Sequence, residues 1–323
     1  MNPQALVLLL SALGANYEPE FMALFTTLEY RYTGGDYENE PFRYRLFIPE
    51  PTQSPAKQPL IVWLNGFGEA GDDNIQQLRW LSQLMFRPPW QRERYPFFLL
   101  AIQSPSDNPA WTGSGGKDEM IRVVEAIMRQ TMADYPVDED RIYLAGISSG
   151  GSACWEFGIR RPTLFAAIAP MASGGSNNPE LAALKGIPIW AFHSNRDSAP
   201  PPDAVRKTVR QLAAKGGSVH LTEVDSAVHD CWNAAFSEHR VLDWLLAQRR
   251  GRSGWWTSSP VFAARTRASN FIASWQWWQI LLQLGIPVLL VLAVWNARRQ
   301  RRLRRERLRQ AGQGNTASGG FRS

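Results

Sequence analysis

Residues 141–151 read RIYLAGISSGG, and this stretch decides how the rest of the chain is interpreted. Its apolar run breaks into Gly-Ile-Ser-Ser-Gly, and the pattern G-x-S-x-G is typical of a buried strand that turns sharply into a helix. Such a turn strains its central serine, exposes the hydroxyl, and needs small residues two positions before and after it. Ser148 has glycine at both positions, whereas Ser149 would place Ile147 at one of them. Ser148 is therefore our candidate nucleophile. The alternative interpretation of the motif is a glycine- and serine-rich loop that has no catalytic role.

A serine hydroxyl becomes a nucleophile at neutral pH only beside a histidine base that is oriented by an acid. After an elbow of this kind, the acid and the base follow along the chain in that order. Of the four histidines, His229 alone stands in a loop at the end of a predicted strand, so it is the candidate base. Asp197 follows another apolar strand after a short polar loop and is the candidate acid. Asp225 and Asp230 stay open as alternatives because they are close to His229 in sequence.

A second glycine-flanked loop, NGFGE at residues 65–69, follows the predicted strand at Leu60–Leu64. Backbone N–H groups in such a loop can face the negative charge that develops on a substrate carbonyl. We expect the N–H groups of Phe67 and Ser149 to form this oxyanion hole. Trp111 lies on a loop rich in Pro, Gly and Ser, where we expect it either to wall a substrate pocket or to pack on the domain.

Apolar segments alternate with helical patterns up to residue 250, as a mainly parallel sheet requires. Strands are predicted at Leu60–Leu64, Phe97–Ile102, Arg141–Ile147, Ala166–Ala172, Ile187–His193 and Val219–Val224. An antiparallel edge hairpin before them is predicted from Leu28–Thr33 and Phe42–Ile48. Helices are predicted at Asp118–Asp134, Ser149–Arg161, Pro202–Lys215 and Ala234–Arg249. The pattern predicts an α/β fold in a single catalytic domain of ordinary size.

Several segments together resemble a known family. They are LIVWLNGFGEAGDDN, LLAIQSP followed by Trp111, RIYLAGISSGG, PIWAFHSNRD and HDCWNAAF. They are similar to the α/β-hydrolases, in the esterase and prolyl-oligopeptidase-like "predicted peptidase" group near phospholipase/carboxylesterases and polyhydroxybutyrate-depolymerase-type esterases. The resemblance covers roughly residues 40–250. It implies the α/β-hydrolase fold, with Ser148 as nucleophile, Asp197 as acid and His229 as base.

Two positions depart from the family pattern. Asn65 stands where the family usually has histidine, and Ser194 stands where it usually has glycine. The first departure bears on the support of the oxyanion loop and leaves the triad untouched. The leading hypothesis is a serine hydrolase acting on carboxylic esters, with a peptidase or an inactive binding protein as alternatives. No metal-ligand spacing, phosphate-binding glycine loop or cofactor motif is present, so we expect a small ester or peptide substrate and no cofactor.

The chain changes character after residue 250. Residues 251–323 contain twelve arginines, no lysine and one acid, and carry a net charge of +11. The whole chain carries +6, which leaves −5 on residues 1–250. The basic balance of the chain therefore belongs to its end alone, and we expect no nucleic-acid partner for the catalytic domain.

Phe271–Trp295 is mostly apolar and long enough to cross a bilayer core. Tryptophans gather at both of its ends, as they do at membrane interfaces, so we expect a single transmembrane helix. An amphipathic helix lying on the membrane is the alternative. Arg298–Arg309 contains eight arginines, whereas only Arg265 and Arg267 lie shortly before the span. The positive-inside rule then predicts a cytoplasmic tail and a catalytic domain on the other side of the membrane.

That topology requires export. The apolar run Ala5–Leu13 with small residues after it predicts a signal segment, although no basic residue precedes Arg31, which makes the signal atypical. We divide the chain into an apolar N-terminal segment (1–16), the catalytic domain (17–250), a linker (251–270), the membrane helix (271–295) and an Arg-rich tail (296–323). Cys154 and Cys231 leave the compartment open, because both a bridge and two buried thiols agree with the sequence.

Overall fold

The computed structural model describes residues 19–35, 37–50, 56–81, 96–106, 111 and 119–251. The described residues all lie in the first of two compact units of the chain, Met1–Ser259. The expected signal segment, membrane helix and Arg-rich tail lie outside them. Within the part of the chain that is described, no helix is long and apolar enough to cross a membrane.

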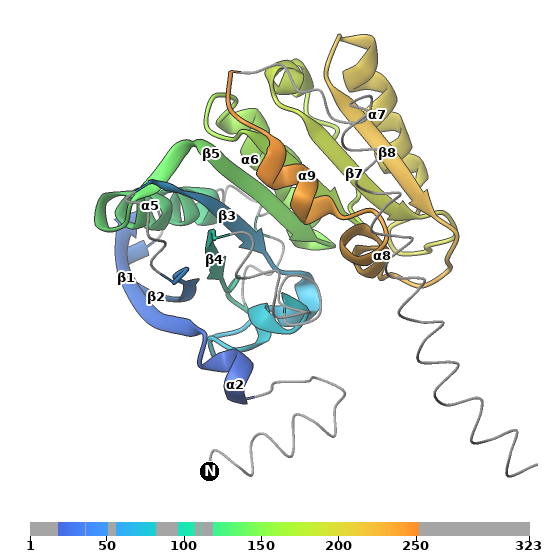
Figure 1. Ribbon diagram of the computed structural model, residues 1–323. Coiled ribbons are helices and arrows are strands. Elements are labelled where there is room, and N and C mark those ends of the chain that lie inside the picture. Colours follow the sequence, from blue (N-terminus) through green and yellow to red (C-terminus); the bar gives the residue numbers. More distant parts are fainter. Residues whose placement is uncertain are drawn as a thin grey trace, which may run out of the picture. The chain divides into compact units, whose positions relative to one another are not determined.

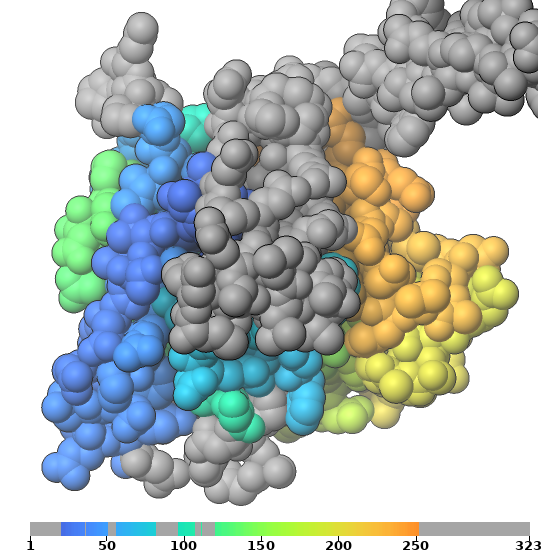
Figure 2. All heavy atoms as spheres, turned by 90° about the horizontal axis from the view of Figure 1, so that it is seen from below, coloured from blue at the N-terminus to red at the C-terminus, as the bar shows by residue number. Residues whose placement is uncertain are grey.

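A single eight-stranded sheet forms the centre of the described residues, in the order β1-β2-β4-β3-β5-β6-β7-β8 (Figure 1). The strands are β1 (Phe25–Gly34), β2 (Tyr37–Phe47), β3 (Gln58–Leu64), β4 (Phe98–Ile102), β5 (Val137–Ile147), β6 (Ala167–Met171), β7 (Ile189–Ser194) and β8 (Val219–Val224). Strands β3 to β8 run parallel, and the hairpin β1–β2 joins β4 in the antiparallel direction. Figure 2 shows the hairpin and the C-terminal elements at opposite sides of one face.

Helices cover both faces of this sheet. The helices of the described residues are α2 (Pro19–Met22), α5 (Glu119–Asp134), α6 (Ser149–Arg160), α7 (Asp203–Ala214), α8 (Trp232–Ser237) and α9 (Val241–Ala247), with short 3₁₀ helices η1 (Phe67–Glu69), η2 (Gln76–Leu78) and η3 (Leu181–Gly186). Along β3, Leu60, Val62 and Leu64 join one core with residues of α5, α6 and α7. Trp63 points to the opposite face, because side chains alternate along a strand, and it packs on Phe236 of α8. Helix α9 covers this second face as well (Figure 1).

The expected α/β architecture is present, but one predicted helix is wrong. The sequence pattern predicts a continuous helix at Ala234–Arg249, whereas the structure has α8 and α9 in its place. The N–H groups of Glu238 and His239 both donate to the Ala234 carbonyl, which closes α8. Arg240 then takes a left-handed conformation with φ of 55° before α9 begins. A non-glycine residue in this region interrupts a right-handed helix.

Candidate active site

Ser148 occupies the turn between β5 and α6. Its φ of 53° and ψ of −117° place it in a region that residues with a side chain rarely adopt, as an elbow serine should. The flanking glycines are needed for steric reasons. A Cβ atom on Gly146 would lie 2.6 Å from the Gly150 carbonyl oxygen, and one on Gly150 would lie 2.2 Å from the Leu64 carbonyl oxygen. The Ser148 N–H donates to the Met171 carbonyl at 2.9 Å, which holds the turn against β6.

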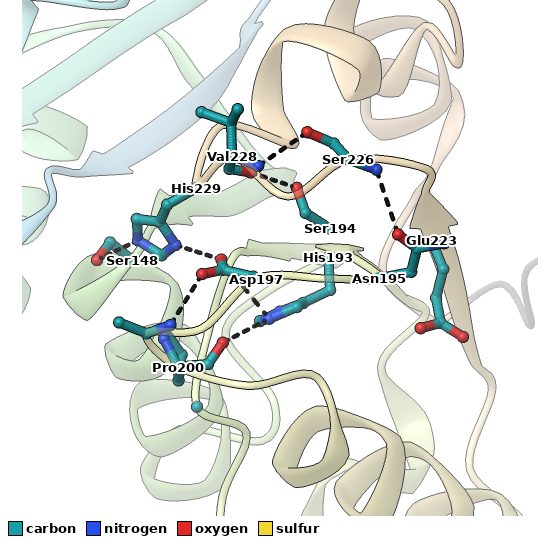
Figure 3. A network of polar contacts seen from close by, with 12 residues as sticks. Ser148, His193, Ser194, Asn195, Asp197, Pro200, Glu223, Ser226, Val228 and His229 are labelled. Carbon is teal, nitrogen blue, oxygen red and sulfur yellow. Dashed lines mark hydrogen bonds and ion pairs between the residues drawn. The ribbon is translucent and has the colours of Figure 1, made fainter.

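The side chains of Ser148, His229 and Asp197 form one continuous chain of hydrogen bonds (Figure 3). The Nε2 atom of His229 lies 2.9 Å from the Ser148 hydroxyl oxygen. Its Nδ1 atom lies 2.5 Å from Oδ2 of Asp197. The acid follows β7, the base follows β8, and the serine follows β5, so all three stand at the carboxyl ends of parallel strands. The structure therefore brings together the three residues that the motif selects.

The charge state of Asp197 fixes the tautomer of His229. Burial is the largest influence on this carboxyl and works to raise its pKa. The Ala199 N–H, 2.9 Å from Oδ1, and the contact with His229 outweigh burial and hold the pKa of Asp197 below its ordinary value. An ionised carboxylate only accepts hydrogen bonds, so Nδ1 of His229 carries the proton. Nε2 is then left with a lone pair and accepts the Ser148 hydroxyl proton.

The other acids and the other histidine near the triad make contacts elsewhere. Asp225 has an 84% exposed side chain and pairs with Arg196 at 3.2 Å. Asp230 accepts a hydrogen bond of 3.4 Å from the Asn233 side chain in the turn that starts α8. His193 is buried, with Nε2 3.0 Å from the Pro200 carbonyl oxygen, and burial lowers its pKa, so it is a neutral neighbour of Asp197.

The predicted oxyanion loop lies beside the nucleophile. A Cβ atom added to Gly66 would be 3.3 Å from Cβ of Ser148, so the two backbones approach closely. Phe67 is the first residue of η1, and the first N–H groups of a helix have no partner inside it. Ser149 is likewise the first residue of its helix, α6. The two backbone groups expected to form the hole thus lie at the starts of η1 and α6 next to Ser148, and the dipole of the longer helix α6 favours negative charge there.

The side chain of Asn65 holds this loop through hydrogen bonds. Its side chain donates to the Gly66 carbonyl at 2.8 Å and to the Ser104 hydroxyl at 2.9 Å, and it accepts from the Ser104 N–H at 3.1 Å. Trp111 donates from Nε1 to the Asn65 carbonyl at 2.9 Å and is 1% exposed. Of the two roles expected for Trp111, the burial and this hydrogen bond agree with packing on the domain, and a part in a substrate pocket stays a prediction. These partners are 39 and 46 residues away in sequence, so no local pattern indicates them.

Sequence reasoning also misses Glu69, a buried acid of the same loop. It is 7% exposed, and burial raises the pKa of its carboxyl. The carboxyl accepts a hydrogen bond from Nε1 of Trp80 at 3.2 Å. Trp80 in turn contacts Trp232, with ring centroids 5.5 Å apart, and Trp232 contacts the His229 ring at 5.7 Å. Through Trp80 and Trp232, the oxyanion loop is thus in contact with the catalytic base His229. The signal that could have indicated Glu69 is an acid inside a glycine-flanked loop that follows a strand.

The two cysteines are free and buried, so they do not form the bridge that the sequence left open. Burial raises the pKa of the Cys231 thiol to about 12, and it raises that of Cys154 as well. Thiols in this state react poorly, because the thiolate is the nucleophile. Across the described ranges, no group of three or more His, Cys, Asp or Glu side chains is arranged to hold a metal ion.

No protein-family model and no curated protein matches the sequence. Among solved structures, a thermostable esterase is 30% identical, with a TM-score of 0.64, over 71% of this chain and 64% of its own. An acylaminoacyl peptidase from Pyrococcus horikoshii is 14% identical, with a TM-score of 0.54, over 74% of this chain and 45% of its own. A ferulic acid esterase from Anaeromyces mucronatus is 18% identical, with a TM-score of 0.53, over 66% of this chain and 87% of its own.

The chain spans less than two thirds of the length of the first two of these proteins. The likenesses to the peptidase and to the ferulic acid esterase concern the fold alone, because the identities are low. The mainly parallel eight-stranded sheet of this chain superposes on all three structures with TM-scores above 0.5. Together these findings identify the chain as an α/β-hydrolase by fold.

Proposed function

We propose that this protein is a membrane-tethered serine hydrolase that cleaves carboxylic esters through an acyl-enzyme on Ser148. The observation that carries the proposal is the unbroken contact from Asp197 through His229 to Ser148, and the lowered pKa of Asp197 supports it. The 30% identity to an esterase supports esters as the substrate class. A domain kept only for binding has no need of this arrangement.

In the first half of the reaction, Nε2 of His229 takes the proton of the Ser148 hydroxyl as Oγ bonds to the ester carbonyl carbon. The electron pair of the carbonyl moves onto its oxygen, which the N–H groups of Phe67 and Ser149 stabilise. Asp197 stabilises the imidazolium that forms. When the carbonyl reforms, the bond to the alcohol oxygen breaks, and His229 returns the proton to that oxygen. The alcohol leaves, and the acyl group stays on Ser148.

In the second half, water replaces the alcohol. Nε2 of His229 takes a proton from water as the water oxygen attacks the acyl carbon, and the same backbone N–H groups hold the charged oxygen. The carbonyl reforms, the bond to Oγ of Ser148 breaks, and the proton returns to Oγ. The carboxylic acid leaves, and the enzyme is restored without a cofactor or a redox change.

A peptidase is the second candidate within the same chemistry. Amides use the same triad, and the fold is shared with an acylaminoacyl peptidase. The two substrate classes differ in the leaving group, since an amine must be protonated before it departs and an alcohol departs more readily. The membrane tether rests on the sequence alone, through the apolar span at Phe271–Trp295 and the arginines after it.

The proposal is tested with the full chain in detergent, a fluorophosphonate probe, and a panel of p-nitrophenyl esters and peptide anilides. We expect the wild type to be labelled and to turn over esters faster than anilides. Ser148→Ala should abolish both labelling and turnover, and Ser149→Ala should keep measurable activity, because its backbone N–H is unchanged. Labelling of the Ser148→Ala protein at the wild-type level contradicts the nucleophile assignment. Preferential cleavage of anilides replaces the esterase by the peptidase.

A further inference from the structure

The loop that carries His229 is fastened to the end of β7 by a contact outside the triad (Figure 3). Ser194 is the last residue of β7 and is fully buried. Its hydroxyl donates to the Val228 carbonyl at 2.7 Å. Val228 directly precedes His229, and the residue is 61% exposed although its carbonyl turns inward to Ser194. The hydrogen bond therefore holds the peptide group between Val228 and His229.

The backbone of Ser194 contacts the acid as well. Its carbonyl accepts the N–H of Asp197 at 3.2 Å, which closes the turn that presents the carboxylate. Ser194 thus bonds to the peptide before His229 through its side chain and to Asp197 through its main chain.

Further bonds fasten the rest of the loop more remotely. The Asn195 N–H donates to the Val224 carbonyl at 2.9 Å, and the Arg196 N–H donates to the Ser226 carbonyl at 3.0 Å. The Val228 N–H donates to the Ser226 hydroxyl at 3.0 Å. These contacts hold residues 224–228, whereas the Ser194 hydroxyl contacts the last carbonyl before His229.

We propose that Ser194 is a positioning residue that holds His229 in register with Asp197 and Ser148 through its hydroxyl. The inference deepens the proposed function and rests on it. The catalytic hydrogen bonds require placement of the imidazole within a fraction of an ångström, and small misplacements reduce rates strongly. Without the hydroxyl, an inward-turned carbonyl loses its donor, and the peptide can rotate to find another one.

The test compares Ser194→Ala, which has no donor, with Ser194→Cys, a near-isosteric weak donor, and Ser194→Thr, which keeps the hydroxyl. We expect Ser194→Ala and Ser194→Cys to lower kcat for a p-nitrophenyl ester about tenfold or more, with KM changed less than about twofold. Ser194→Thr should recover most of kcat. The matched control is Thr131→Val, which removes another buried hydroxyl that donates to a backbone carbonyl, that of Ile127 at 2.9 Å, on α5.

A spectroscopic measurement separates positioning from general stability. The short contact between Nδ1 of His229 and Asp197 should give a low-field proton resonance in the full-length protein. We expect this resonance to broaden or shift in Ser194→Ala and Ser194→Cys, to persist in Ser194→Thr, and to be unchanged in Thr131→Val. Thermal unfolding of each variant identifies any that fails to fold, and Ser194→Cys, which preserves the packing, then decides.

The two proposals fail in different ways. An inactive, unlabelled wild type overturns the esterase function, while the resonance still reports whether Ser194 holds His229. An active wild type with unchanged kcat and resonance in folded Ser194→Ala or Ser194→Cys overturns the positioning role. A loss of kcat in Thr131→Val equal to that in Ser194→Ala also overturns it, because the effect would then follow from any buried hydroxyl deletion.

Discussion

At the scale of single residues, the acid of the triad is set apart from its rivals by its contacts. Asp197→Asn replaces an acceptor with an amide that can donate to Nδ1, which favours the wrong tautomer of His229. We expect kcat to fall by about 10³ to 10⁴ with a small change in KM. Asp225→Asn is the matched control and should stay within about twofold, because its carboxylate pairs at the surface with Arg196. Equal losses in the two variants would contradict the assignment.

Asp197 also predicts how stability depends on pH. Its pKa in the folded protein lies below the ordinary value of 3.8, so the unfolded chain binds its proton more tightly. The contribution of the carboxylate to stability is therefore fully present above the unfolded pKa and is lost as the pH falls through the folded pKa. Urea unfolding of the wild type should show a stability that falls as the pH drops below about 4, and Asp197→Asn should lack this part of the loss. An equal acid loss in the two proteins would contradict the argument.

The sequence predicts these three residues well because each has a local signature. The serine stands in a motif, and the acid and base follow strands in the expected order. The groups that hold them are different. Asn65 is supported by Ser104 and Trp111, and Ser194 by contact with Val228, all at separations of more than thirty residues. Contacts of this length depend on the packed fold, and no spacing along the chain encodes them.

At the scale of elements, the elbow depends on the close approach of α6 to the end of β3. A Cβ atom on Gly150 would lie 2.2 Å from the Leu64 carbonyl oxygen and 2.5 Å from that of Asn65. Gly150→Ala should therefore destabilise the fold by about 2 kcal/mol or more and lower Tm by about 4 °C or more. Gly68→Ala is the control, since a Cβ atom there meets nothing within 4 Å. Its Tm should match the wild type in a thermal melt, and a Gly150→Ala protein that also matches would contradict the steric argument.

Strand positions could be predicted because apolar runs with βα alternation persist over the whole domain. The predicted helix at Ala234–Arg249 failed because Arg240 is left-handed, and an arginine carries no signal for that conformation. The start of β5 was placed four residues late, since Val137–Asp140 is mostly acidic and does not read as a strand. Arg141 and Arg249 pair with Asp138, so the charges are satisfied by tertiary contacts that composition does not reveal.

At the scale of the whole catalytic domain, the last described residues are bound far from the site. Arg249 pairs with Asp138 at 2.9 Å and with Asp140 at 3.2 Å, and the Arg250 N–H donates to the Asp140 carbonyl. These acids lie near the start of β5, whereas Ser148 follows its end. Eight residues of strand at about 3.3 Å each separate Asp140 from Ser148 by about 26 Å. The chain therefore leaves the described domain at the edge opposite to the triad.

This placement predicts that the exit affects stability and leaves catalysis unchanged. Arg249→Ala removes two contacts of a partly exposed charge network and should lower Tm slightly, because water and salt screen such pairs. The kcat for an ester should stay within about twofold of the wild type because the triad lies at the other edge. Arg210→Ala, an exposed arginine of α7, is the control and should change neither quantity. A large loss of kcat in Arg249→Ala would show that the two edges are coupled.

The last prediction concerns topology. An apolar span at Phe271–Trp295 with eight arginines after it and two shortly before it should hold the tail in the cytoplasm and the catalytic domain outside. Ser318→Cys should then resist an impermeant maleimide in intact cells. Lys215→Cys, at an exposed position after α7, should react once the outer envelope is permeabilised.

The native thiols give this experiment a low background, because Cys154 and Cys231 are buried and burial raises the pKa of both. The reverse labelling pattern would mean a tail-anchored enzyme that faces the cytoplasm. One feature of the sequence favours that outcome: no basic residue precedes Arg31, although signal segments usually begin with basic residues. Since the arginine bias and the N-terminal segment disagree, the reactivity of residues 215 and 318 decides which of them sets the orientation.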